Sequence, residues 1–100
     1  MGDFEDLWRL HQNAQFPPSG LPLSVDGVRL VKIDAAAGAI LTASLRTDAA
    51  VRPLDPAKRA DLERHRGLIV KALQELPLDA EAKAYFERLS VLSDRVLKGS

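Results

Sequence analysis

The chain has 100 residues, 46% hydrophobic and 28% charged, and its fourteen basic and fourteen acidic side chains cancel. These values indicate one globular domain over residues 1–100, exclude a disordered chain, and disfavour nucleic acid or anionic lipid as a partner. The absence of cysteine excludes disulfides and thiolate metal sites, and no apolar run reaches the roughly 20 residues of a membrane span. The first ten residues also lack a secretion signal, so we expect a cytoplasmic protein with no membrane contact.

The first predicted element is a short helix over about residues 4–14. Apolar side chains recur there at helical spacing, and Asp3 stands where a helix cap would. The helix must end before Phe16-Pro17-Pro18-Ser19-Gly20, because proline lacks an N–H and forces the preceding residue out of helical geometry. These residues predict a loop.

Alternating apolar and polar residues predict a tight hairpin in the next segment. Asp26-Gly27 is a pair that accepts positive φ at both positions of a two-residue turn. That turn would place Val25 opposite Val28 and Leu23 opposite Leu30, with all four side chains on one face of the ribbon.

The alternation continues to Leu45 and predicts a third antiparallel strand. The second strand leads through Val31 and Ile33 to a turn over residues 34–38, and residues 39–45 alternate again. An alternative interpretation makes residues 34–39 a helical turn because of their alanines, but Gly38 and the brevity of the run count against it. The favoured prediction is a three-stranded meander, followed by a connecting segment over residues 46–53.

Two long helices are predicted at the carboxyl end. Asp55 and Pro56 form a strong helix start, and Pro77 ends that helix after Leu76. Asp79 caps a third helix that continues to Gly99. The short joint favours an antiparallel helical hairpin packed on the sheet, so the predicted fold class is α+β.

The two histidines are the side chains whose ordinary pKa is nearest neutrality, and both fall in apolar stripes. One hypothesis brings His11 and His65 together, with Tyr85, in a ligand pocket between sheet and helices. The favoured interpretation is that each ring packs at the edge of the core and bonds a backbone carbonyl. No metal-binding spacing accompanies either histidine, and we expect no metal, no cofactor and no catalytic residue.

An aromatic and arginine set predicts a contact surface for another protein. The short first helix and the proline-rich loop could dock loosely and leave apolar area uncovered. Aromatic side chains with nearby arginines are the usual anchors of protein interfaces. The candidate partner-binding residues are Trp8, Arg9, Phe16 and Arg88.

The helix predicted over residues 56–76 is locally basic and raises a nucleic-acid hypothesis. On a helical wheel, however, Arg59 and Arg66 lie on one flank of the apolar stripe while Arg64 and Lys71 lie on the other. No single basic face would enter a groove, and nucleic acid remains the least favoured partner.

Several short segments resemble a family of small bacterial proteins of similar length with no known activity. They are Leu7-Trp8-Arg9-Leu10-His11, Phe16-Pro17, Val25-Asp26-Gly27-Val28 with Leu30-Val31, Leu54-Asp55, Leu76-Pro77 and Tyr85-Phe86-Glu87-Arg88-Leu89. The resemblance covers nearly the whole chain, but it implies neither a site nor a substrate.

These observations favour a non-enzymatic cytoplasmic protein that binds another protein, or a second copy of itself as a homodimer. A small-molecule binding protein or minor enzyme using His11 and His65 is the first alternative. A nucleic-acid-binding regulator using residues 56–76 is the second.

Overall fold

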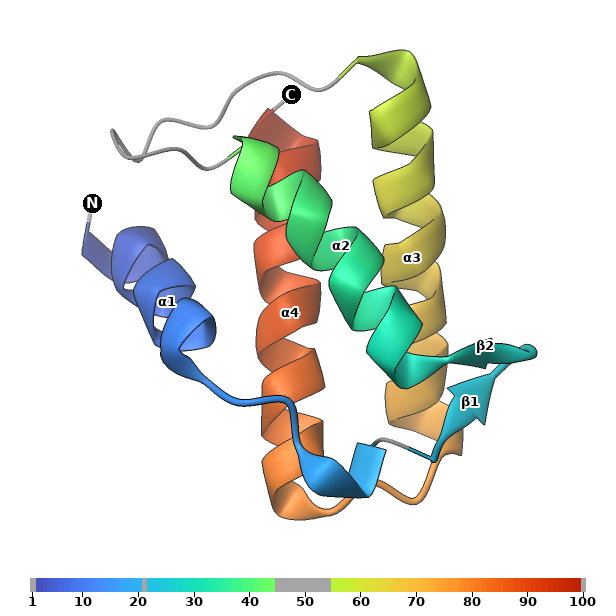
Figure 1. The fold of residues 1–100 in the computed structure, drawn as a ribbon. Helices are drawn as coiled ribbons and strands as arrows, with labels where there is room; N and C mark the ends of the chain where they lie inside the picture. Colours follow the sequence, from blue (N-terminus) through green and yellow to red (C-terminus); the bar gives the residue numbers. More distant parts are fainter. Residues whose placement is uncertain (1, 21, 45–54, 100) are drawn as a thin grey trace.

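The computed structural model describes residues 2–20, 22–44 and 55–99, and these are mostly helical (Figure 1). The connecting segment predicted over residues 46–53 lies outside them. A two-stranded sheet replaces the predicted three-stranded meander, so the predicted α+β class is wrong. The elements are α1 (Gly2–Asn13), the 3-10 helix η1 (Pro18–Gly20), β1 (Ser24–Val25), β2 (Val28–Arg29), α2 (Leu30–Ser44), α3 (Pro56–Glu75) and α4 (Ala80–Gly99).

The predicted helical hairpin is confirmed as α3 and α4, which run antiparallel and side by side (Figure 1). Both predicted caps are made. The Asp55 carboxylate accepts the Lys58 N–H at 2.8 Å, and the Asp79 carboxylate accepts the Ala82 N–H at 2.8 Å. Each cap satisfies one of the free N–H groups at a helix start, which is why the boundaries could be predicted from local sequence.

The predicted turn at Asp26-Gly27 is also confirmed. Their φ values are 51° and 79°, as a tight two-residue hairpin turn requires, and Val25 pairs with Val28. The Leu30 N–H donates to the Leu23 carbonyl at 3.0 Å, so the predicted register holds up to Leu30, the first residue of α2.

Residues 30–44 form the helix α2, so the predicted second turn and third strand are wrong. The chain adopts the helical alternative for residues 34–39 and extends it in both directions. Gly38 costs such a helix only about 1 kcal/mol relative to alanine. The buried residues recur at intervals of three or four, the period of a helix: Leu30, Ile33, Ala37, Ile40, Leu41 and Ser44.

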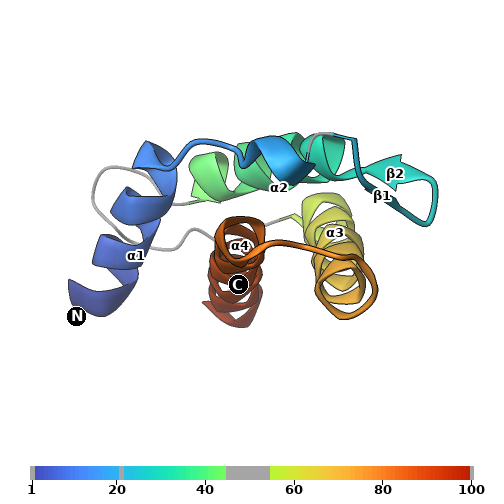
Figure 2. The same cartoon turned by 90° about the horizontal axis from the view of Figure 1, so that it is seen from below.

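The helices pack in two layers, seen along α4 in Figure 2. One layer holds α3 and α4, and α2 crosses over them, so the hairpin covers a helix where a sheet had been predicted. The side chains between the layers, including those of Ile33, Leu62 and Phe86, are fully buried. Helix α1 lies beside α4, on the side opposite α3 (Figure 2), and it begins at Gly2, so Asp3 lies within the helix and does not precede it.

Gly67 tests whether a solvent-facing glycine weakens α3. A Cβ added there would meet no atom within 4 Å, so Gly67→Ala should raise the free energy of unfolding by about 1 kcal/mol through helix propensity. Gly27→Ala is the matched control, because its φ of 79° is unfavourable for alanine, and this variant should lose about 1 kcal/mol. Urea unfolding followed by circular dichroism measures both. A Gly67→Ala variant no more stable than the original chain would contradict this account of α3.

Candidate functional site

Tyr85, on the buried face of α4, is where the amino-terminal elements meet the hairpin. Its hydroxyl donates to the Asp34 carboxylate of α2 at 2.8 Å. The centre of its ring lies 4.7 Å from that of His11 in α1 and 5.6 Å from that of Phe16 in the following loop. One side chain therefore joins three segments to α4.

His11 is buried between Trp8, Tyr85 and Arg88. The Trp8 ring is stacked on the imidazole with 6.4 Å between ring centres, and His11 Nδ1 accepts the Arg88 Nε–H at 3.2 Å. Burial first, and the Arg88 charge second, lower the pKa of His11 from 6.5 to about 4. The imidazole is therefore neutral at physiological pH and serves as a hydrogen-bond acceptor.

Arg88 is half-buried and held in place by two of these neighbours. Its Nε bonds His11, and its guanidinium carbon lies 5.7 Å from the centre of the Tyr85 ring, in a cation–π arrangement. In residues 2–20, 22–44 and 55–99, no carboxylate forms an ion pair with Arg88. The two terminal guanidinium nitrogens therefore keep their capacity to bind an acceptor.

The Asp34 carboxyl and the Tyr85 hydroxyl have shifted pKa values. Burial raises the pKa of Asp34, and the hydrogen bond from Tyr85 opposes part of that rise. Burial also raises the pKa of Tyr85, and so do the hydrogen bond to Asp34 and the Asp34 charge. The phenol thus keeps its proton and acts as a fixed donor to the carboxylate.

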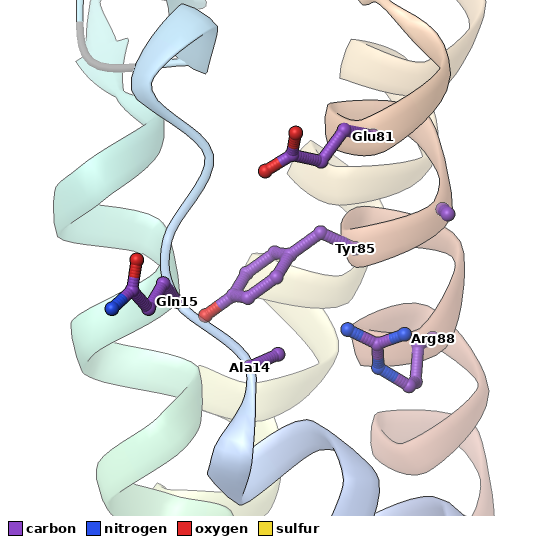
Figure 3. A pocket seen from close by; sticks show the side chains of 6 residues that line it. Ala14, Gln15, Glu81, Tyr85 and Arg88 are labelled. Carbon is purple, nitrogen blue, oxygen red and sulfur yellow. The ribbon is translucent and has the colours of Figure 1, made fainter.

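A pocket of about 360 Å³ opens beside this cluster. Figure 3 shows Arg88 and Tyr85 projecting from α4 toward the segment that carries Ala14 and Gln15, with Glu81 nearer the start of the same helix. The walls are mixed in character, because small apolar side chains alternate with polar ones. The lining residues are Ala14, Gln15, Glu81, Ala84, Tyr85 and Arg88.

His65 does not join His11. It lies on α3, and Figure 2 shows α3 and α1 on opposite sides of α4. Its Nδ1 donates to the backbone carbonyl of Asp61, one turn earlier, at 2.7 Å, and its ring is buried. This is the arrangement expected of a core histidine. The predicted ligand set therefore divides: His11 and Tyr85 are in contact, and His65 belongs to another part of the core.

The predicted partner-binding residues gather around the same tyrosine, with one exception. Trp8 reaches it through His11, Phe16 touches it edge-on with 75° between the rings, and Arg88 lies over its face. Arg9 is exposed and pairs with Asp6 at 3.7 Å. Two sets of residues that the sequence separated, one for a ligand and one for a partner, thus form largely one cluster.

Sequence reasoning missed Asp34, Gln15 and Glu81. Asp34 had been assigned to a turn, which removed it from any helix face. Glu81, Tyr85 and Arg88 recur at intervals of four and three, so they share one face of α4, and this spacing could have identified Glu81. Gln15 has no comparable signal, because its place depends on how the loop after α1 packs.

The basic side chains considered for nucleic acid are engaged by carboxylates. Arg59 pairs with Glu63 at 3.3 Å and Arg64 with Asp61 at 2.8 Å. Arg66 pairs with Asp94 at 3.3 Å, and Lys71 pairs with Asp26 at 2.7 Å. The charge along α3 is thus balanced locally.

Comparisons with protein-family models, curated proteins and solved structures find no match to this chain. Within the part of the chain that the structure describes, no group of three histidine or acidic side chains could hold a metal ion. No helix there is long and apolar enough to cross a bilayer. The resemblance to small bacterial proteins stays a prediction.

Removing the Tyr85 hydroxyl tests the contact with Asp34. Tyr85→Phe leaves a partly buried carboxylate without its donor and should lower the free energy of unfolding by about 1.5–3 kcal/mol. Asp34→Asn keeps an acceptor and removes the charge. Because the pKa of Asp34 is raised, the stability of Asp34→Asn relative to the original chain should grow as the pH rises from the ordinary carboxyl pKa of 3.8 through the raised one. Urea unfolding across that pH range measures the free energy of unfolding of both variants. A Tyr85→Phe variant as stable as the original chain would contradict the contact.

The lowered pKa of His11 should make stability depend on pH. Between pH 6.5 and about 4 the unfolded chain binds a proton that the folded chain does not, so the free energy of unfolding should fall as the pH is lowered through this window. His11→Asn keeps an acceptor near the Nδ1 position and does not titrate, so it should flatten this dependence. Equal slopes for the original chain and His11→Asn would refute the assignment.

Proposed function

We propose that this chain is a non-enzymatic cytoplasmic module that binds another polypeptide through the exposed side of α1 and α4. The observation that carries the proposal is the exposure of Leu10 and Val91, which are 56% and 54% accessible. Leu10 belongs to α1 and Val91 to α4, the helix that carries Arg88. A cysteine-free chain needs no oxidising compartment, which supports the cytoplasm.

Helix geometry supports a single shared surface. His11 faces α4, and Arg88 and Tyr85 face α1. At about 100° per residue, and with α1 and α4 running in opposite directions (Figure 1), Leu10 and Val91 both turn to the side away from α2. We call the surface made by Leu10, Ala84, Arg88 and Val91 the α1–α4 face. Apolar side chains around an arginine are a common composition for a protein interface.

The protonation states of the cluster support binding over catalysis. A general acid or base works best when its pKa lies near the operating pH. The pKa of His11 lies well below neutrality and that of Tyr85 above its ordinary value. Both groups are also occupied in hydrogen bonds that fix neighbouring segments.

A small carboxylate ligand is the second candidate, and the pocket volume favours it. About 360 Å³ falls within the range of small-ligand sites. In this version Tyr85 and Arg88 bind the ligand, and His11 positions Arg88.

Peptide selection tests the proposed interface. A phage-displayed library of random dodecapeptides is selected on the original chain, and the binders are measured against the double variant Leu10→Ser, Val91→Ser. Removing both apolar contacts should weaken the binders by about tenfold or more. The matched control is Leu68→Ala on α3, a partly buried position away from the proposed face.

Light scattering over a concentration series tests whether the bound polypeptide is a second copy of this chain. A mass that rises with concentration and returns to one chain in the double variant would make a second copy the bound polypeptide. Strict monomer behaviour together with no selected peptide that depends on Leu10 and Val91 would refute the proposed function.

A further inference from the structure

We infer that Arg88 receives a carboxylate from a partner polypeptide, and that Glu81, at the other end of the same pocket, receives a basic group from the same segment. The inference rests on the proposed function and names the chemistry of the partner. The pocket would then select a segment that carries both charges, whereas a uniformly acidic segment would be repelled by Glu81.

The arrangement of Arg88 carries the first half of the inference. A guanidinium binds a carboxylate best through two parallel N–H donors. At Arg88 the Nε–H is already used by His11, and the Tyr85 ring lies against the guanidinium. The terminal nitrogens Nη1 and Nη2 are left as the donors for a ligand, on a side chain whose freedom is already restricted.

The charge balance around Arg88 points in the same direction. The basic residues of α3 named above are paired with carboxylates inside the protein. Arg88 is half-buried and lines a pocket, yet no carboxylate in the described ranges pairs with it. Partial burial of an unpaired charge is unfavourable, and an incoming carboxylate would relieve that cost.

Glu81 carries the second half. It lines the same pocket and is exposed, and it stands seven positions before Arg88, which corresponds to two helical turns, about 10 Å along the axis. A peptide in the polyproline II conformation has three residues per turn and rises about 9 Å over them, so side chains three positions apart project from the same face. A segment lying along α4 could therefore place an acidic side chain at Arg88 and a lysine or arginine, three residues away, at Glu81.

The deciding variant is Ala84→Glu. Ala84 is exposed, lines the pocket and lies one turn before Arg88. A glutamate four residues before an arginine forms a favourable ion pair within a helix, so this variant should stay folded while its new carboxylate occupies Arg88. Ala84→Gln has the same size without the charge and is the matched control.

The peptides selected above are the probe. We expect them to be enriched in an acidic residue with lysine or arginine three positions away. Their affinity for Ala84→Glu should be about tenfold or more below their affinity for Ala84→Gln, so that the charge and not the added size accounts for the loss. Selection on Glu81→Gln should keep the acidic residue and lose the preference for the basic one. Arg9 is two residues before His11 and so turns away from α4, outside the α1–α4 face; Arg9→Gln should bind as the original chain does.

The outcomes separate the two proposals. Peptides that depend on Leu10 and Val91 but bind Ala84→Glu unchanged, or that lack an acidic residue, would overturn the role of Arg88 and leave the proposed interface standing. Free glutamate and citrate are also measured. If either binds the original chain as tightly as the peptides do, the inference that the carboxylate comes from a polypeptide is wrong. If the chain forms a dimer and Ala84→Glu dissociates it, a second copy of the chain supplies the carboxylate, and a different protein as the partner is excluded.

Discussion

The contact between Tyr85 and Asp34 is the interaction on which the attachment of the amino-terminal half depends. The hairpin of α3 and α4 has its own caps and its own apolar seam, and α1, the loop after it and α2 all contact this one ring of α4. The raised pKa of Asp34 records the cost of burying its charged form, and the hydrogen bond from the Tyr85 hydroxyl offsets part of that cost. Helix α2 is also held by its buried stripe, whereas α1 relies more heavily on the aromatic cluster.

The same contacts that dock α1 also prepare Arg88 for a ligand. His11 must be neutral to accept the Arg88 Nε–H, and burial beside the guanidinium keeps it so. The Tyr85 ring restricts the guanidinium from one side. Ordering an arginine on binding normally costs rotamer entropy, and here much of that ordering is done during folding. Structural and binding roles therefore coincide in one cluster, which explains why His11 looked like a core residue and Arg88 like an interface residue.

The fold could be predicted where a local signal decides the structure. Asp55, Asp79 and the Asp26-Gly27 turn each act through hydrogen bonds or φ values within a few residues, and all three predictions hold. Residues 30–44 failed because two periods fit them. Alternation suits residues 39–45, whereas the spacing from Leu30 to Ser44 suits a helix, and burial against α3 and α4 decides between them. A large apolar side chain gains about 1.5–3 kcal/mol on burial, so the stripe outweighs the cost of Gly38.

The aromatic, imidazole and guanidinium residues of the site could be predicted from the sequence, but their grouping could not. Trp8, His11, Phe16, Tyr85 and Arg88 were all named from residue type and position, because aromatic, imidazole and guanidinium groups are the ones that recognise ligands. Which of them meet depends on how α1 packs on α4, and this contact joins residues more than seventy positions apart, such as His11 and Arg88. Glu81 could have been identified once α4 was predicted, since its spacing to Tyr85 and Arg88 places the three residues on one face of the helix. Asp34 could not have been identified in this way. Its assignment to a turn was wrong, and its bond to Tyr85 could therefore not be inferred from any pattern in the sequence.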